Sequence, residues 1–333
     1  MKCINNHPKK IRYKQVISML CILSVVLSGC GKQTISMAYS MDMPVSSFST
    51  LEDIDLKTAD SFASDLCVTD KDMLEGTDVD MTDAVSAGLF DIKHHKVLYA
   101  KNVHERLYPA SLTKIMTALV ALKYGNPEDI ITVSSHVNIT ESGAQLCGLK
   151  EGDTLTLDQA LHALLIRSAN DAGIAIAEHI GGSVEGFADM MNAEAKAIGA
   201  TNSHFVNPHG LSDDSHYVTA YDMYLIFNEA IKYKQFTEII QTAAYDTTYK
   251  DKDGNAKTLS FETTNQYLNG GQKAPDNITV LGGKTGTTNA ARNCLIIYSK
   301  DIAGNSYISV ILSSKERAIL YQEMTDILSE IKN

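Results

Sequence analysis

Alternation of hydrophobic and polar residues predicts two β-hairpins that are far apart in the chain. The first spans residues 85–91 and 96–100, with a tight turn at Lys93–His95 between them. The second spans residues 293–299 and 306–313, on either side of a glycine-containing loop. Because the hairpins lie at opposite ends of the periodic region, we expect both to contribute to one antiparallel sheet.

Between the hairpins, hydrophobic residues recur at intervals of three and four, which is typical of helices that bury one side. The clearest such segment follows Pro109 and stops at Gly125. Another helix is expected to begin at Thr156, because Thr156 and Gln159 have the spacing of a capping box. Further helices are predicted over residues 171–180, 183–198 and 315–331. The sequence therefore predicts an α/β (α+β) fold, with an antiparallel sheet flanked by helices and a helical subdomain inserted between its strands.

The N-terminus has the pattern of an export signal. Five basic residues precede an apolar run over residues 16–27, which is shorter than the about 20 residues that a membrane-spanning helix needs. The run ends in Leu27-Ser-Gly-Cys30, which resembles a bacterial lipobox. We therefore expect a lipoprotein signal peptide over residues 1–29, a lipid on Cys30, and anchoring at the outer face of the cytoplasmic membrane. An ordinary secretory signal with a chance cysteine is the alternative.

Residues 30–82 differ in composition from the rest of the chain. They are rich in Ser, Thr, Met and Asp and have little periodicity. We interpret them as an acidic, disordered tether that leads to a folded domain over residues 83–333.

Composition and charge limit the class of protein. Hydrophobic residues make up 44% of the 333 residues, which is ample material for a core. Residues 1–29 carry five basic and no acidic side chains, so their removal changes the formal net charge from −11 to −16. That charge argues against nucleic-acid binding. After removal of the signal peptide, the cysteines that remain are Cys30, Cys67, Cys147 and Cys294. Because none of them has Cys-x-x-Cys spacing, we predict neither a disulfide framework nor a metal site.

Three short motifs follow one another in the predicted domain: Ser111-Leu-Thr-Lys114, Ser168-Ala-Asn170 and Lys284-Thr-Gly-Thr287. Each is weak alone, since Ser-x-x-Lys recurs at residues 329–332. In this order and at this separation they resemble the active-site signature of the penicillin-binding proteins and serine β-lactamases. The chemistry that this signature implies is acyl transfer through a serine ester.

Residue types and spacing fit that chemistry. Ser111 lies near the start of the helix predicted after Pro109, and Lys114 follows three residues later on the same side. A lysine must be neutral to accept the serine proton, and both burial and a second cation lower a lysine pKa. Lys284 is the candidate for that second cation.

Longer segments resemble one family within this group, the low-molecular-mass D-alanyl-D-alanine carboxypeptidases of the serine peptidase S11 type. The resemblance runs from about Ala84 to the C-terminus. It implies a β-lactamase/transpeptidase-like fold with the site in a cleft between the sheet and the helical subdomain. The segments that carry it are Tyr108–Thr117, Arg167–Ala172, Asn207–Leu211, Tyr217–Asp222 and Gly282–Thr288.

The resemblance implies a catalytic role for three side chains and a substrate-binding role for Thr287. Ser111 would be the acylated nucleophile and Lys114 its base. Ser168 would relay a proton to the leaving amine. The backbone N–H groups of Ser111 and Thr287 would bind the oxyanion.

The resemblance also implies how substrate is held. Asn170 would bind the peptide backbone, and Lys284 and Thr285 would bind the terminal carboxylate. The substrate would be a peptidoglycan stem peptide ending in D-Ala-D-Ala, β-lactam antibiotics would be covalent inhibitors, and no cofactor is expected. Many relatives continue into a β-rich domain and an amphipathic anchor, whereas only 49 residues follow Lys284 here; we expect the lipid at Cys30 to replace that anchor.

One position departs from the family pattern. Relatives usually have Ala-Gly before the residue that precedes the cysteine, whereas this chain has Ala291-Arg-Asn-Cys294. Arg292 is interpreted either as an additional cation for the substrate carboxylate or as an outward-pointing side chain.

Two other functions are weighed. A class A-like β-lactamase should have Glu-x-x-x-Asn between the second and third motifs, and Glu262 and Asn265 have the wrong spacing. A non-catalytic penicillin-binding sensor is disfavoured by the intact motifs. Transpeptidation to an amine acceptor remains open, because water and an amine compete for the same acyl-enzyme.

Overall fold

The computed structural model describes residues 63–74, 79–141 and 143–332. The predicted signal peptide and Cys30 lie outside these residues. The described strands are β1 (Ser86–Asp91), β2 (Lys96–Lys101), β3 (Ile130–Thr132), β4 (Thr154–Thr156), β5 (Ala244–Lys250), β6 (Ala256–Glu262), β7 (Ile278–Thr288), β8 (Arg292–Asp301) and β9 (Ser306–Ser314).

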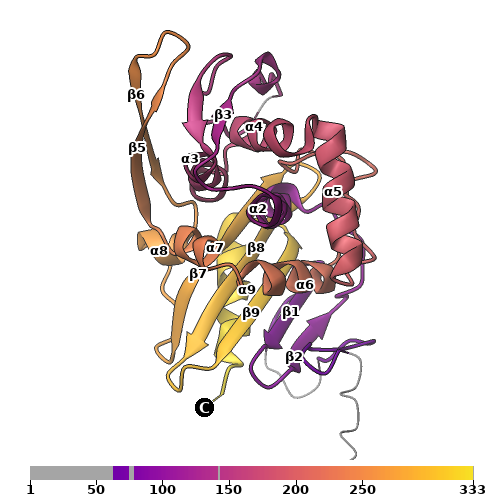
Figure 1. The fold of residues 1–333 in the computed structure, drawn as a ribbon. Helices are drawn as coiled ribbons and strands as arrows, with labels where there is room; N and C mark the ends of the chain where they lie inside the picture. The colour runs from indigo at the N-terminus through magenta and orange to yellow at the C-terminus, as the bar shows by residue number, and fades with distance from the viewer. Residues whose placement is uncertain (1–62, 75–78, 142, 333) are drawn as a thin grey trace, which may run out of the picture. The chain divides into compact units, whose positions relative to one another are not determined.

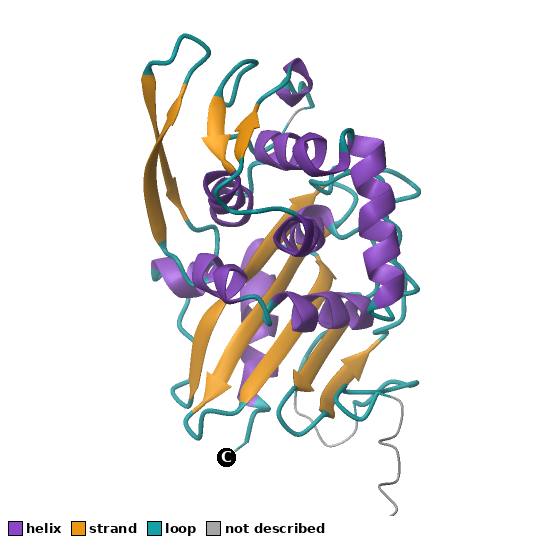
Figure 2. Ribbon diagram, in the orientation of Figure 1, coloured by secondary structure: helices purple, strands orange, loops and turns teal. Residues whose placement is uncertain are grey.

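Most of the described helices lie together beside these strands (Figures 1 and 2). They are α2 (Thr113–Tyr124), α3 (Leu157–His162), α4 (Asn170–Gly181), α5 (Val184–Ala197), α6 (Ala220–Ala230), α7 (Lys234–Ile240), α8 (Gln266–Asn269) and α9 (Arg317–Ser329). Single turns of other types are the 3₁₀ turns η2 (Ala110–Leu112) and η3 (Ser135–Val137) and the π-helical turn η4 (Ala163–Arg167).

A five-stranded antiparallel sheet forms the base of the domain. Its order is β2-β1-β9-β8-β7, so the two hairpins predicted from the sequence are joined by the pairing of β1 with β9. The expectation that both ends of the domain feed one sheet is confirmed. α9 packs on one face of the sheet through Leu320, Met324 and Ile327, while α6 and the rest of the helical part lie on the other face (Figure 2).

A smaller sheet lies at the far side of the helical part. Its order is β3-β4-β5-β6, and the long hairpin β5–β6 extends away from the helices (Figure 1). Alternate residues of β5 are exposed and half-buried. This hairpin was not predicted from the sequence, although the alternation along β5 is typical of a strand with one covered face.

Several local predictions are confirmed. Thr156 and Gln159 form both hydrogen bonds of the capping box that begins α3. Ser183 caps α5 by accepting from the backbone N–H of Gly186. By contrast, α2 was predicted to bury one side, yet every residue from Thr113 to Ala121 is buried. The reason is that α4, α5 and α6 all pack around it.

The predicted tether is wrong for residues 63–74 and 79–82. Cys67 is fully buried and has three hydrogen bonds: its N–H donates to the Tyr224 hydroxyl at 2.9 Å, its carbonyl accepts from the Tyr221 hydroxyl at 2.8 Å, and its thiol donates to the Asp91 carbonyl at 3.3 Å. Because the hydrogen-bonding groups of this residue are satisfied inside the domain, the folded part begins before the predicted boundary at residue 83.

We predict that Tyr224→Phe destabilises the chain by about 1–2 kcal/mol, because the buried N–H of Cys67 loses its acceptor. The phenyl ring keeps the stacking on Phe90, whose centroid lies 4.2 Å away, so packing is preserved. Denaturant unfolding of the full chain measures the effect. Tyr124→Phe is the matched control, because Tyr124 is 55% exposed and should change stability by less than about 0.5 kcal/mol. Equal stability of the two variants would contradict the conclusion that the hydrogen bond to Tyr224 helps to hold Cys67 in the folded domain.

Candidate active site

The first motif straddles the start of the central helix. Ser111 lies in the 3₁₀ turn η2 and α2 begins at Thr113, so the serine precedes the α-helix that the sequence predicted for it. The Lys114 side chain, fully buried, reaches back so that its Nζ lies 2.9 Å from the Ser111 Oγ. The nucleophile–base distance expected from the Ser-x-x-Lys spacing is therefore present.

The Lys114 amine has two further partners besides Ser111. Its Nζ donates to the Asn170 Oδ1 at 2.7 Å and to the His209 carbonyl at 2.6 Å. These acceptors come from α4 and from the loop that precedes α6. Three segments that are distant in the sequence therefore converge on one nitrogen atom.

The second and third motifs meet at another buried amine. The Lys284 Nζ donates to the Ser168 Oγ at 2.9 Å and to the Thr285 carbonyl at 2.9 Å. Ser168 follows the π-helical turn η4 and has a φ of 67°, a left-handed conformation that few serines adopt. Such strain is tolerated where surrounding contacts impose it, and here it directs the hydroxyl toward β7.

Burial lowers the proton affinity of both amines. Burial first, and then the positive charge of Lys284, hold the pKa of Lys114 well below its usual value of 10.5, while the carboxylate of Asp171 acts in the opposite direction. Burial also lowers the pKa of Lys284 from 10.5 to about 7. A neutral Lys284 amine is therefore accessible near neutral pH, and the neutral form of Lys114 is favoured relative to that of an exposed lysine.

Glycines permit the close approach of the segments around Ser111. A Cβ on Gly286 would lie 3.0 Å from the Ser111 nitrogen, so β7 passes directly beside the nucleophile. Gly210 has a φ of 87°, and a Cβ there would lie 1.8 Å from the Ala110 oxygen. Ala110 itself has a left-handed φ of 48°. Side chains at either glycine would push these segments apart.

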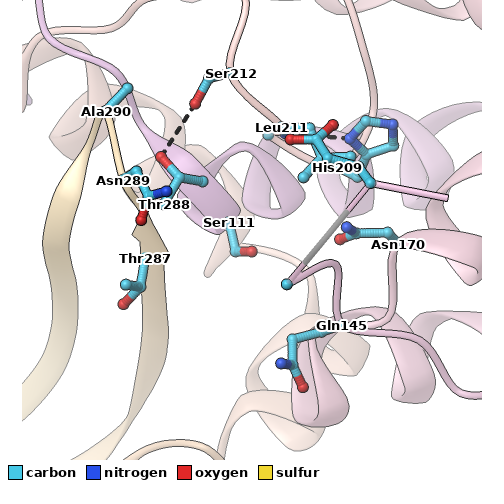
Figure 3. Close-up of a pocket in the computed structure, with 13 residues that line it drawn as sticks. Ser111, Gln145, Asn170, His209, Leu211, Ser212, Thr287, Thr288, Asn289 and Ala290 are labelled. Atoms are coloured by element: carbon cyan, nitrogen blue, oxygen red, sulfur yellow. Dashed lines mark hydrogen bonds between the residues drawn. The ribbon is translucent and has the colours of Figure 1, made fainter. Parts of the chain in front are cut away.

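An open cleft of about 420 Å³ lies over Ser111. Figure 3 shows Ser111 near its centre, with Thr287 and Thr288 on one side and Asn170 and Gln145 on the other. The Ser212 hydroxyl, from the loop before α6, donates to the Thr288 Oγ1 at 3.1 Å, which links that loop to the end of β7. Residues lining the cleft are Ser111, Glu141, Gly143, Gln145, Asn170, His209, Gly210, Leu211, Ser212, Thr287, Thr288, Asn289 and Ala290.

The predicted substrate-binding residues divide into two groups. Asn170 and Thr287 line this cleft, whereas Lys284 and Thr285 are not among its lining residues. Lys284 is 1% exposed, and the Thr285 hydroxyl pairs with the Thr264 hydroxyl at 2.6 Å. Lys284 therefore contacts the interior side of the site, where it holds Ser168.

Sequence reasoning missed two residues of the site. No role in the site was predicted for His209 within the segment Asn207–Leu211, yet its carbonyl is an acceptor for Lys114 and the residue lines the cleft. Burial lowers the pKa of its imidazole from 6.5 to about 3, so the ring is neutral. Gln145 was not considered at all. The neighbouring Gly210 is the sequence signal that could have pointed to His209, because a glycine permits close contact between two backbone segments, here with Ala110.

The backbone at Arg292 has the conformation that the family's usual glycine suits, and the side chain is the outward-pointing one of the two interpretations. Arg292 begins β8 after a three-residue turn and has a φ of 57°, the left-handed conformation that glycine adopts most easily. Its side chain is exposed and it is not among the residues that line the cleft. The turn therefore has the left-handed backbone that glycine adopts most easily, although the residue at this position is arginine.

Comparisons with known proteins agree with the geometry. Residues 73–316 match the family described as D-alanyl-D-alanine carboxypeptidase, Peptidase S11. The chain is 37% identical over 224 residues to D-alanyl-D-alanine carboxypeptidase DacF of Bacillus subtilis (strain 168), covering 66% of this chain and 54% of that protein. It is 33% identical over 250 residues to D-alanyl-D-alanine carboxypeptidase DacC of Escherichia coli (strain K12), covering 72% and 59%. The chain thus spans little more than half the length of these relatives.

Solved structures give a fuller match. The crystal structure of the Streptomyces K15 DD-transpeptidase superposes with a TM-score of 0.70 at 27% identity, covering 76% of this chain and 98% of that one. This likeness confirms the predicted β-lactamase/transpeptidase-like fold.

We predict that Lys284→Met stabilises the folded chain at low pH. An unfolded lysine has a pKa near 10.4, whereas the folded value is about 7. Below about pH 7 folding therefore buries an ammonium at full cost, and this cost vanishes as the pH rises toward the unfolded pKa. The free energy of unfolding should increase by roughly 1–3 kcal/mol at about pH 6, with the gain shrinking toward pH 10.

Denaturant unfolding at several pH values measures this gain. Lys150→Met, at an exposed position, is the matched control and should show no such trend. A difference between Lys284→Met and wild type that is constant across pH would refute the buried-ammonium explanation.

Proposed function

Because the chain belongs to the D-alanyl-D-alanine carboxypeptidase family, we propose that it is a serine-type carboxypeptidase of the cell envelope. Its substrate is a peptidoglycan stem peptide ending in D-Ala-D-Ala, from which it releases the terminal D-Ala. β-Lactam antibiotics acylate the same serine and act as covalent inhibitors. The observation that carries this proposal is the 2.9 Å contact between the Lys114 Nζ and the Ser111 Oγ.

The partners of Lys114 suit it to act as the base. A neutral amine has two N–H groups and one lone pair. The Asn170 Oδ1 and the His209 carbonyl can only accept, so they engage the two N–H groups. The lone pair is then left for the third neighbour, the Ser111 hydroxyl. The hydrogen-bond pattern thus favours an arrangement in which neutral Lys114 receives the serine proton.

Acylation follows from this arrangement. The Ser111 Oγ forms a bond to the scissile carbonyl carbon while its proton passes to the Lys114 Nζ. The carbonyl oxygen becomes an oxyanion, for which the backbone N–H groups of Ser111 and Thr287 are the proposed donors. The close passage of Gly286 beside the Ser111 nitrogen supports this pairing.

Collapse of the tetrahedral intermediate requires a proton on the leaving nitrogen. Ser168 donates it and is reprotonated by Lys284, whose Nζ contacts the Ser168 Oγ. Once Lys114 has taken the proton of Ser111, repulsion between the two ammonium groups favours loss of the Lys284 proton to Ser168. The proton on Lys114 then passes to the neutral Lys284 amine. Lys114 is neutral again and can accept a proton from the water that hydrolyses the ester.

Transpeptidation is a second candidate for the fate of the acyl-enzyme. The structural neighbour named DD-transpeptidase, of which this chain covers 98%, favours it. An amine acceptor would attack the same ester as water, so the two activities differ only in the nucleophile of the second step. We propose hydrolysis as the main reaction because the curated relatives in the comparison are named carboxypeptidases.

We further propose that the chain is exported and anchored by a lipid on Cys30 at the outer face of the cytoplasmic membrane. In this proposal residues 1–29 are the signal peptide, residues 30–62 are the tether, and the catalytic domain begins near residue 63. The sequence alone supports the anchor, because Cys30 lies outside the described residues. None of the helices in the described segments is long and apolar enough to cross a bilayer.

Product analysis tests the proposed activity. We expect the full chain to release D-Ala from a defined pentapeptide ending in D-Ala-D-Ala, and Ser111→Ala to reduce release by at least about 10³-fold because no ester can form. An added amine acceptor measures the transpeptidase share. Mass spectrometry after penicillin treatment should place a covalent adduct on Ser111. An adduct on Ser168, or D-Ala release by Ser111→Ala, would disprove the assignment.

The anchoring proposal has its own test. Cys30→Ser should block lipidation and leave the protein soluble or unprocessed, because the sulfur that carries the lipid is absent. Cell fractionation and mass spectrometry of the N-terminus measure the outcome. The conservative replacement Cys67→Ser is the control, since residue 67 is buried in the domain. Fully processed Cys30→Ser protein that stays on the membrane would show that another segment anchors the chain.

A further inference from the structure

A buried carboxylate follows the second motif directly. Asp171 is the second residue of α4 and is 1% exposed. Its carboxylate is not among the groups that line the cleft. It accepts from the backbone N–H groups of three consecutive residues, Cys147 at 3.0 Å, Gly148 at 2.8 Å and Leu149 at 3.1 Å. The N–H of Ala172 at 3.1 Å and the Cys147 thiol at 3.4 Å complete its contacts.

These contacts are all to neutral groups. Within residues 63–74, 79–141 and 143–332, no lysine, arginine or histidine forms an ion pair with Asp171. Converging N–H dipoles and the start of α4 stabilise the charge without cancelling it. A negative charge therefore remains inside the domain, one residue away from the Asn170 amide that holds Lys114.

The segment that Asp171 binds leads directly into one wall of the cleft. Residues 145–149 have no regular secondary structure, and Gln145 lines the cleft (Figure 3). The Gln145 carbonyl accepts from the Asn170 N–H at 2.8 Å. Together, the backbone of Asn170 and the carboxylate of Asp171 attach this segment to the start of α4.

We propose that Asp171 is a positioning residue with two effects on Ser111 acylation. Its carboxylate holds the Gln145–Leu149 segment, and with it the wall of the cleft at Gln145, against bound substrate, and its negative charge favours the protonated form of Lys114. This inference rests on the proposed function, because it concerns the same acylation step.

The electrostatic effect depends on which charged groups surround Lys114. From β7 it faces Lys284, which favours its neutral form, and from α4 it faces Asp171, which favours its protonated form. From the loop before α6 it faces His209 and His216, whose pKa values burial lowers to about 3 and about 4, so both are neutral. Asp171 is thus the anion that opposes Lys284 in setting when Lys114 loses its proton.

Asp171→Asn separates these effects in one experiment. The readout is the second-order rate constant for penicillin acylation of the full chain between about pH 5 and pH 9. We expect the plateau rate to fall at least about 10-fold, because an amide offers fewer acceptors and presents an N–H group to the wall. We also expect the midpoint of the rising limb to move to lower pH by roughly half a unit to one unit, because a charge that favours protonated Lys114 is removed.

Two further variants make the result decisive. Asp171→Glu keeps the charge but shifts its position, so it should lower the plateau and leave the midpoint near the wild-type value. Asp222→Asn is the matched control: Asp222 is buried in the first turn of α6 and accepts from the Asn202 N–H and the Ser203 hydroxyl, both at 2.8 Å. It should change stability without moving the midpoint.

Each outcome is informative. An unshifted midpoint in Asp171→Asn overturns the electrostatic effect, and a plateau within twofold of wild type overturns the effect on the wall. If Asp171→Asn does not fold, as judged by circular dichroism, Asp171→Ser is measured in its place. Failure of the wild-type chain to be acylated at Ser111 would instead refute the proposed function, so the two failures are distinguishable.

Discussion

The arrangement of the site depends on the burial of two lysine amines beside two serine hydroxyls. A buried ammonium is costly, so Lys114 and Lys284 can be enclosed only because their protons are easily lost and because oxygen atoms meet every N–H that remains. This requirement explains why α4, β7 and the loop before α6 converge on so small a volume. The central helix α2, buried all round over residues 113–121, supplies the rigid support from which Lys114 projects.

Much of the architecture follows from local patterns. The hairpins β1–β2 and β8–β9, the capping box at Thr156 and the cap at Ser183 depend on residues close together in sequence, and the predictions for them hold. The three-residue spacing of Ser111 and Lys114 also sufficed to predict that they are neighbours. These features share one property: the residues that determine them lie within a few positions of one another.

Other features depend on contacts that no local pattern contains. Cys67 was assigned to a tether because residues 30–82 lack periodicity, yet its partners Tyr221 and Tyr224 lie about 150 residues later. The His209 carbonyl acts on Lys114 only because Gly210 lets the loop approach η2. Lys284 was expected to meet the substrate carboxylate directly, but its burial depends on how the helical part closes over β7. Such placements are products of packing, and spacing in the sequence does not determine them.

The left-handed conformations of Ala110 and Ser168 have a consequence for the origin of activity. A short peptide containing either residue would relax to a right-handed or extended backbone, because the left-handed form costs about 1 kcal/mol or more. The local sequence around Ser111 or Ser168 therefore does not determine the backbone conformation found in the site. The shape is imposed by Gly210, by Gly286 and by Lys284, which are remote in the chain. Reactivity of Ser111 is in this sense a property of the assembled domain, because it depends on segments that meet only in the folded chain.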